Sequence, residues 1–199
     1  MSELKVNKVS PATGTAITLG DSGDTFTVPS GATIVNSGTA TGFGGGKVLQ
    51  VVSTTMTASF TTTASSPTQI SGLSCAITPS ATSSKVLIMV DVGCLALPAS
   101  YFGSVELRRG TSTAICIGDQ VGSNRPQRTG PIAAPDIGSR YFSMNFLDSP
   151  STTSATTYYL YGYCESSGKL SINQLDGDYD HAIQGARGAS TMTLMEIGV

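Results

Sequence analysis

The sequence contains few of the side chains that carry enzyme chemistry or bind nucleic acid. It has one histidine, no tryptophan and only 12% charged residues in 199 positions, with a formal net charge of −2. So little positive charge provides no basic face for DNA or RNA. No serine or cysteine lies in a recognisable nucleophile motif. We therefore expect a non-enzymatic protein that binds no nucleic acid and needs no cofactor.

Long apolar runs and paired cysteines are also missing. The most apolar stretch, Lys85 to Leu97, is interrupted by Asp91 and is too short to cross a bilayer, so we expect no membrane insertion. No apolar segment follows Met1 to Lys8, which argues against a signal peptide. The cysteines are widely spaced and form no CxxC pair, so we expect reduced thiols in a protein folded in a cytoplasm, not a zinc or redox site. They are Cys75, Cys94, Cys116 and Cys164.

Serine, threonine and glycine supply the hydrophilic character that charge does not. The chain has 23 glycines, yet 39% of its residues are apolar, more than a disordered tract would carry. Threonine between branched and aromatic residues favours β-strands. No stretch shows helical periodicity, so the sequence predicts an all-β protein.

Residues 1–46 differ from the rest of the chain. Three short apolar segments, 16–20, 25–29 and 33–36, follow one another at a period of about eight residues, with Gly, Asp or Pro turns between them. A rung with only two apolar residues cannot form a core within one chain and must stack on neighbours. We therefore predict a short, intertwined, three-fold β-shaft, followed by a glycine-rich hinge over Thr39 to Gly46.

Residues 47–199 predict a second domain, an antiparallel β-sandwich head. Strand number and the absence of a Cys, Trp, Cys arrangement favour a jelly-roll order over an immunoglobulin-like one. The predicted strands are Lys47 to Ser53, Met56 to Thr62, Ile70 to Ile77, Lys85 to Leu97, Tyr101 to Arg108, Ala114 to Ile117, Arg140 to Leu147, Thr156 to Cys164, Lys169 to Asn173 and Ser190 to Ile197.

The phase of the apolar residues predicts where some of these strands lie. Lys85 to Leu97 is apolar on both faces in its middle, so it should be a central strand. Arg140 to Leu147 alternates apolar and polar residues, and so does Lys169 to Asn173. These two strands should each have one face in water.

Four tyrosines lie close together at Tyr158, Tyr159, Tyr161 and Tyr163, and the last three share one strand face. Such a stripe suits sugar stacking, because aromatic faces match the apolar faces of sugars. It also suits a contact between subunits or between sheets, with the hydroxyls at the rim. We favour the contact, since a symmetric head must bury some surface between its subunits.

Asp176, Asp178 and Asp180 alternate as in the first half of an EF-hand calcium loop. However, His181 stands where that loop needs a glycine, and Arg187 stands where it needs a bidentate carboxylate. We therefore predict a solvated acidic turn and no metal site. A polysaccharide-cleaving activity would need paired carboxylates in a cleft, and these three acids would be the place to look.

Two long segments are predicted to be irregular loops, which in a compact domain are often functional. Gly118 to Gly138 and Leu175 to Ala189 concentrate the scarce charges. If the last strand pairs antiparallel with the first, as in a jelly roll, the second loop lies at the end of the head away from the shaft. The candidate receptor-binding residues are Tyr179, His181 and Arg187 in that loop, with Arg125 and Arg128 in the other.

Three stretches of the sequence resemble virion fibre proteins of marine tailed phages, including those that infect cyanobacteria. The first contains Leu4-Lys5-Val6-Asn7-Lys8-Val9-Ser10-Pro11, Gly20-Asp21-Ser22-Gly23-Asp24-Thr25 and Pro29-Ser30-Gly31-Ala32-Thr33-Ile34. The others are Phe146-Leu147-Asp148-Ser149-Pro150 with Thr156-Thr157-Tyr158, and Gly188-Ala189-Ser190-Thr191-Met192-Thr193-Leu194-Met195-Glu196-Ile197.

The resemblance implies a virion component whose N-terminal part attaches to other virion proteins and trimerises, and whose C-terminal part is a head. The expected protein is a homotrimeric fibre that contacts a glycan or protein on the host surface. The alternative is a capsid decoration protein, or head fibre, that stabilises the shell. The resemblance supplies no catalytic residues.

Overall fold

The computed structural model describes residues 8–35, 47–123, 126–133, 138–165, 168–182 and 185–198. The chain divides into two compact units, Met1–Phe43 and Gly44–Val199. The boundary predicted from the sequence was three residues later, after residue 46. The described residues contain β-strands and no helix, so none of them forms a helix that could cross a membrane. The protein is all-β, as predicted.

The strands of the second unit follow the predicted ones closely. In the part of the chain that the structure describes they are β1 (Lys47–Met56), β2 (Phe60–Thr62), β3 (Thr68–Ile77), β4 (Lys85–Leu97), β5 (Phe102–Arg109), β6 (Thr113–Ile115), β7 (Gly130–Ala133), β8 (Gly138–Asp148), β9 (Thr156–Cys164), β10 (Leu170–Ile172) and β11 (Ser190–Gly198).

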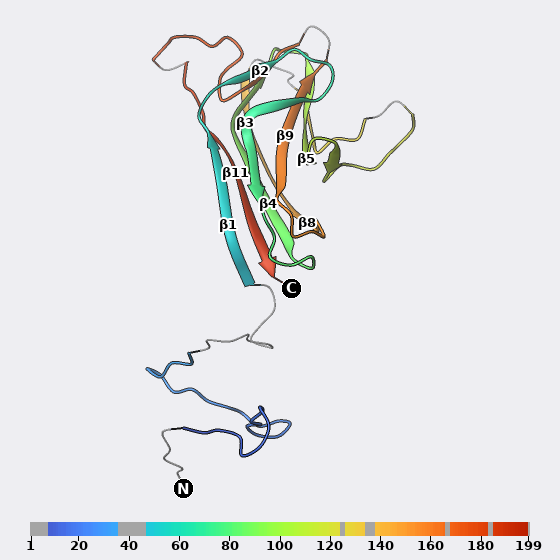
Figure 1. Cartoon of the computed structure of the whole chain (residues 1–199). Helices are drawn as coiled ribbons and strands as arrows, with labels where there is room; N and C mark the ends of the chain where they lie inside the picture. The colour runs from blue at the N-terminus through green and yellow to red at the C-terminus, as the bar shows by residue number, and fades with distance from the viewer. Residues whose placement is uncertain are drawn as a thin grey trace. The chain divides into compact units, whose positions relative to one another are not determined.

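These strands form two antiparallel sheets (Figure 1). One runs β1-β11-β4, with β8 on the other edge of β4, and the second runs β3-β9-β5, with β6 and β7 both pairing with β5. To compare this order with known topologies, we count β6 and β7 as one interrupted strand and leave out the short strands β2 and β10. Eight strands remain, numbered here in chain order. Their order is first, eighth, third, sixth in one sheet and second, seventh, fourth, fifth in the other. This order is that of a jelly roll, which confirms the predicted sandwich topology.

The core lies between the two sheets. The inward side chains of β4 are Val86, Ile88, Val90 and Val92, each at most 1% exposed. β4 pairs with β11 and β10 on one edge and with β8 on the other, so it is central, as predicted. On β8, Phe142, Met144 and Phe146 pack against the core while the residues between them are exposed, which confirms its single wet face.

Two strand predictions were wrong. β10 has no wet face, because Ser171 and Asn173 are as buried as Leu170 and Ile172. The side chain of Asn173 reaches the segment after β1 and is enclosed there. The second error is the loop predicted over 118–138, which contains β7; its proline at position 131 and lack of alternation hid a four-residue edge strand.

The described residues 8–35 contain no strand. The predicted turns do form, since the amide of Asp24 donates to the carbonyl of Asp21 and that of Ala32 donates to the carbonyl of Pro29. Gly20, Gly23 and Gly31 adopt positive φ in or beside these turns. In the predicted intertwined shaft, the strand partners come from other chains. The shaft therefore stays a prediction for this single chain.

The register of β1 and β11 fixes the two ends of the sandwich. Lys47 pairs with Gly198 at one end, and Met56 pairs with Ser190 at the other. The loop before β11 therefore lies at the end of the sandwich away from Lys47, as the jelly-roll argument predicted (Figure 1). A Cβ atom at Gly93 would collide with the backbone of Ala189, so this glycine lets the loop lie close to β4.

All four cysteines are free thiols. Cys75, Cys94 and Cys164 are buried, and Cys116 is half-buried at the end of β6. Burial raises the pKa of the Cys116 and Cys164 thiols. The prediction that the cysteines behave as reduced, small apolar residues is consistent with these positions.

Candidate binding site

The outer face of the second sheet carries an unusual concentration of polar and aromatic side chains. Along β5, Val105 and Leu107 point into the core, and the alternation places Ser104, Glu106 and Arg108 on the opposite face. Their cross-strand neighbours on β9 are, in order, Tyr163, Tyr161 and Tyr159. The predicted tyrosine stripe therefore faces outward, while Tyr158 lies inside the core.

Glu106 is the electrostatic centre of this face. Its side chain is almost fully buried, and each carboxylate oxygen contacts one guanidinium group. Arg108 Nε lies 2.6 Å from Oε1, and Arg128 Nη1 lies 3.2 Å from Oε2. A buried carboxylate needs such partners, because desolvation of an unpaired charge is costly.

The two arginines also cover the tyrosines. The guanidinium of Arg108 lies 4.2 Å from the ring centroid of Tyr161, and that of Arg128 lies 4.5 Å from the ring centroid of Tyr163. Tyr159 meets Tyr161 edge to face, with centroids 6.4 Å apart. These are cation–π and T-shaped geometries. The stripe is therefore not an open stacking platform, because guanidinium groups occupy the faces of two of its rings.

Arg128 comes from the connection between β6 and β7, whose described residues, 116–123 and 126–129, lie over the sheet. Hydrogen bonds close its base, from Gln127 Nε2 to the Gly118 carbonyl at 2.8 Å and from the Leu107 amide to Thr129 Oγ1 at 2.9 Å. The backbone at Cys116, with a φ of 53°, turns the chain away from β6. The ion pair of Arg128 with Glu106 then fixes the segment to β5.

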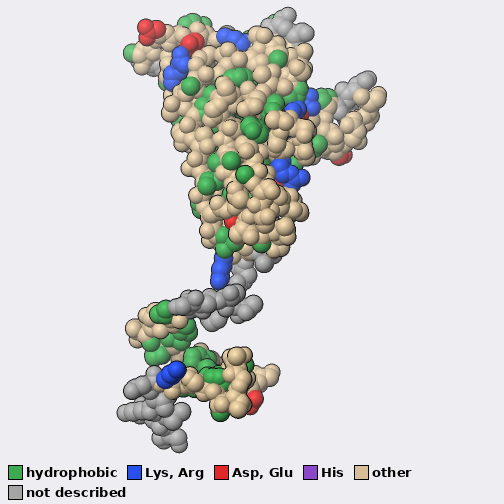
Figure 2. All heavy atoms as spheres, in the orientation of Figure 1, with side chains coloured by type: hydrophobic (Ala, Val, Ile, Leu, Met, Phe, Trp, Pro, Cys, Tyr) green, Lys and Arg blue, Asp and Glu red, His purple; other side chains and the backbone are tan. Residues whose placement is uncertain are grey.

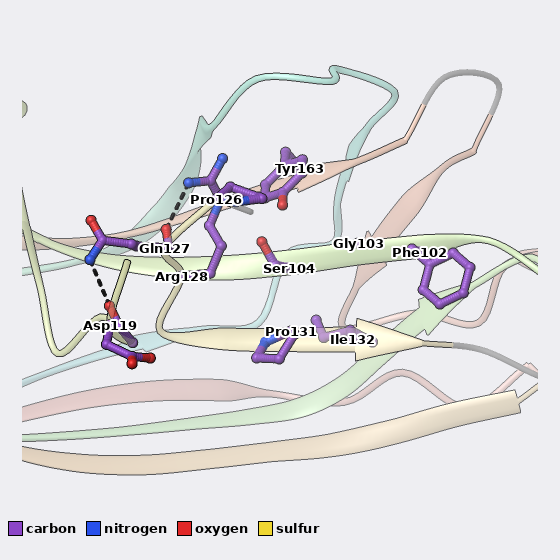
Figure 3. Close-up of a pocket in the computed structure, with 11 residues that line it drawn as sticks. Phe102, Gly103, Ser104, Asp119, Pro126, Gln127, Arg128, Pro131, Ile132 and Tyr163 are labelled. Carbon is purple, nitrogen blue, oxygen red and sulfur yellow. Dashed lines mark hydrogen bonds between the residues drawn. The ribbon is translucent and has the colours of Figure 1, made fainter. Parts of the chain in front are cut away.

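A cleft of about 650 Å³ lies between this segment and the sheet (Figure 3). Its size lies within the range of small-ligand sites. Figure 3 shows the lining side chains coming from β5, β7, β9 and the segment that carries Asp119 and Arg128. They include Phe102, Ser104, Asp119, Pro126, Gln127, Arg128, Pro131, Ile132 and Tyr163.

Two polar atoms beside this cleft have no hydrogen-bond partner among the described residues. They are Ser104 Oγ and Arg128 Nε, and both are buried. Ser104 as a whole is 1% exposed. Buried polar atoms are normally paired, so an unpaired hydroxyl and an unpaired N–H in the wall of one cleft mark it as a site for a polar ligand.

The other predicted candidates lie in the loop before β11. Tyr179 is 62% exposed, His181 is exposed, and Arg187 forms an ion pair with Asp178 at 2.6 Å. The backbone amide of His181 donates to the carbonyl of Tyr179. The structure thus brings these three predicted residues into one loop, at the end of the sandwich away from Lys47.

The two candidates from the other loop have different outcomes. Arg128 lies on the outer face of the second sheet, where it forms an ion pair with Glu106. Arg125 lies outside the described residues. Figure 2 shows that charged side chains on the visible face of the sandwich occupy a few separate spots on a largely uncharged surface.

Two of the three alternating aspartates in the end loop form ion pairs. Asp176 pairs with Lys169 at 3.1 Å, and Asp178 pairs with Arg187. Across the described ranges, no group of three or more His, Cys, Asp or Glu side chains is placed to hold a metal ion. Asp176 and Asp178 are therefore used for separate ion pairs.

One signal for the cleft is present in the sequence and was overlooked. Glu106 stands in the middle of a strand whose alternate residues are core valine and leucine. A carboxylate in a strand centre needs covering partners, which indicates that some segment folds over that face. The same alternation places Ser104 and Phe102 on the face of β5 that carries Glu106, so they too could have been predicted to line the cleft.

Comparisons with known proteins leave the family open. No protein-family model and no curated protein matches this chain. Among solved structures, one of infectious bursal disease virus strain Gx overlaps with 16% identity and a TM-score of 0.28, covering 75% of this chain and 40% of the other. A VP2 subviral particle of the same virus overlaps with 11% identity and a TM-score of 0.31 over the same shares. This chain thus spans about two fifths of the length of those proteins.

Proposed function

We propose that this chain is a non-enzymatic virion protein, a short homotrimeric fibre with a jelly-roll head that contacts the host surface. Its N-terminal region attaches to other virion proteins and joins three chains. The observation that carries the proposal is the exposure of the apolar residues of the N-terminal unit. They are Val9, Ile17, Leu19, Phe26, Val28, Ile34 and Val35, and their exposure ranges from 38% to 82%.

The described N-terminal unit leaves these side chains exposed. They come as pairs on short segments separated by formed turns, and the described part of the unit has no strand of its own. Repeats of this kind become stable when neighbouring units cover their apolar faces. Other copies of the chain, related by a symmetry axis, would cover the apolar faces and would also supply hydrogen-bond partners for the backbone.

The sandwich provides a separate body for contact at the other end of such a fibre. Its exposed end loop, with Tyr179, His181 and Arg187, lies at the end away from Lys47, where the chain enters the sandwich. The sequence resemblance to phage fibre proteins supports the same assignment, with a virion location.

The test is the mass of the full chain in solution, measured by light scattering, beside that of a chain beginning at Lys47. We expect three times the monomer mass for the full chain and loss of trimerisation on truncation. A monomeric full chain would contradict the proposal of a trimeric shaft.

A second candidate function, capsid decoration, is favoured by the outer face of the first sheet. One cross-strand row on this face is entirely apolar, with Val51 opposite Met195, Met195 opposite Leu87 and Leu87 opposite Leu147. Val51 is 54% exposed and Leu147 is 46% exposed. An exposed apolar row of this kind suits a protein–protein contact.

Location on the particle separates the two functions. Antibody labelling of the tail, with loss of adsorption when the gene is removed, would support the fibre. Labelling of the capsid, with loss of particle stability and unchanged adsorption, would support decoration.

A further inference from the structure

We infer that the cleft on the outer face of the second sheet binds an uncharged saccharide, through Ser104 and Phe102. This inference rests on the host-surface contact in the proposed function and names the chemical class of its ligand. It also moves that contact from the end loop to the side of the sandwich.

The polar wall of the cleft calls for a ligand with hydroxyl groups. Ser104 Oγ can donate and accept, and Arg128 Nε–H can only donate. Both atoms are buried without a partner among the described residues. A sugar hydroxyl accepts and donates in turn, so adjacent hydroxyls of one ring satisfy both kinds of group.

The apolar wall calls for a ligand that also has an apolar face. Phe102 is 60% exposed, and the strand alternation places it on the same face as Ser104. Pro131 of β7, the cross-strand neighbour of Ser104, also lines the cleft (Figure 3). The C–H face of a pyranose packs on such a surface while its hydroxyls turn to the polar wall.

The charges of the cleft favour a neutral ligand. Among the described lining residues Arg128 is the basic side chain, and the buried carboxylate of Glu106 lies 3.2 Å from it. Asp119 is an exposed lining residue and adds a negative charge. An anionic sugar would therefore meet a compensated arginine and a repelling carboxylate.

The test is saturation-transfer NMR on the full chain with a panel of sugars at millimolar concentrations. The neutral probes are the methyl glycosides of glucose, galactose, mannose and N-acetylglucosamine, and the anionic probes are glucuronic and sialic acid. We expect transfer to at least one neutral glycoside and little to the anions. Transfer to anions alone, or to no sugar, would overturn the inference.

Two variants locate the site. Ser104→Ala removes a hydroxyl that has no partner among the described residues, and Phe102→Ala shortens an exposed side chain, so both variants should fold normally. Each should weaken binding about tenfold, the effect of one hydrogen bond or one ring contact. Thermal melts confirm folding, and unchanged affinity in both variants would reject this cleft.

Matched controls lie elsewhere in the sandwich. Ser171→Ala removes another buried hydroxyl without a partner among the described residues, and Tyr141→Ala removes an aromatic ring that is 85% exposed on the first sheet. Neither should change sugar binding. If these controls lose binding as Ser104→Ala does, the effect is not local and the cleft is rejected.

The outcomes separate this inference from the proposed function. A chain that trimerises and labels the virion but binds no sugar removes the saccharide site alone. A chain that binds a neutral sugar but is absent from virions keeps the site and removes the virion function.

Discussion

Tyr158 lies inside the core of the sandwich and donates a hydrogen bond of 2.7 Å to a carboxylate oxygen of Asp148. Arg109 Nη1 contacts the same carboxylate at 3.0 and 3.1 Å, so the group joins β5, β8 and β9. Burial, with the hydrogen bond and the charge of Asp148, raises the pKa of Tyr158 well above its ordinary value. The phenol therefore remains a donor throughout the physiological range.

Removing this phenol should cost stability. We expect Tyr158→Phe to lower the free energy of unfolding by about 1.5–3 kcal/mol, because hydrogen bonds to charged groups contribute about that much. Urea denaturation measures the change. The matched control, Tyr141→Phe on the exposed face of β8, should change stability by less than about 0.5 kcal/mol. Equal effects in the two variants would contradict the assigned role.

Glu196 makes stability depend on pH. It is 1% exposed, and although burial alone would raise its pKa, hydrogen bonds from Ser80, Gln50 and Ser84 lower it to about 2. A carboxyl whose folded pKa lies below its unfolded value of about 4.3 adds stability above that value and loses it as pH falls toward 2. The contribution is about 3 kcal/mol at neutral pH.

The check is a series of denaturation curves of the wild type and Glu196→Gln between pH 7 and pH 2. The wild type should be the more stable protein at pH 7, and the difference should shrink between about pH 5 and pH 2. The control Glu165→Gln changes an exposed carboxyl and should give a difference that is small at every pH. A constant gap between wild type and Glu196→Gln would refute the linkage.

Asn173 holds the start of the end loop. Its Nδ2 donates to the carbonyls of Met56 at 2.8 Å and Ala58 at 3.0 Å, and Ser190 Oγ donates to its Oδ1 at 2.6 Å. Its backbone has a φ of 61°, which asparagine tolerates better than most residues. The residue thus serves both as a hydrogen-bond hub and as a left-handed turn.

Two substitutions separate these roles. Asn173→Gly should cost about 2–3 kcal/mol from the unpaired partners, and Asn173→Ala should cost about 1 kcal/mol more because of the positive φ. Chemical denaturation measures both values. The exposed Asn145→Ala on β8 serves as the control, and identical values for the glycine and alanine variants would argue against the backbone contribution.

Phe26 tests the shaft. It is 73% exposed in one chain, so burial between chains would make it a main source of trimer stability. We expect Phe26→Asp to reduce the mass in solution from trimer to monomer and to leave the melting of the sandwich unchanged. Thr25→Asp adds the same charge without removing apolar surface, and it should remain trimeric. A trimer in the Phe26→Asp variant would place association elsewhere.

How far the sequence predicts the structure depends on the kind of signal. The apolar phase of Lys85 to Leu97 identified the central strand, because a strand covered on both faces must be apolar on both. The same reasoning failed for Asn173, since a polar side chain that is buried through hydrogen bonds leaves no apolar pattern in the sequence. β7 was missed because an edge strand that contains Pro131 has neither alternation nor length.

The candidate site was less predictable than the fold. Arg128 was chosen as a charged loop residue, but its position follows from Glu106, which is 22 positions earlier and on another strand. The cleft exists because a segment folds over the sheet, and no local pattern reports that contact. The position of Tyr179, His181 and Arg187 was easier to predict, because the three residues lie in one loop. The pairing of β1 with β11 alone places that loop at one end of the sandwich.

The pairing of β1 with β11 determines when the sandwich can form during synthesis. The first strand of the sandwich and its central strand both take β11 as a neighbour. On the ribosome, neither β1 nor β4 can complete its pairing until residues 190–198 have left the exit tunnel. Until then the chain exposes unpaired strand edges, which favour aggregation of the nascent protein.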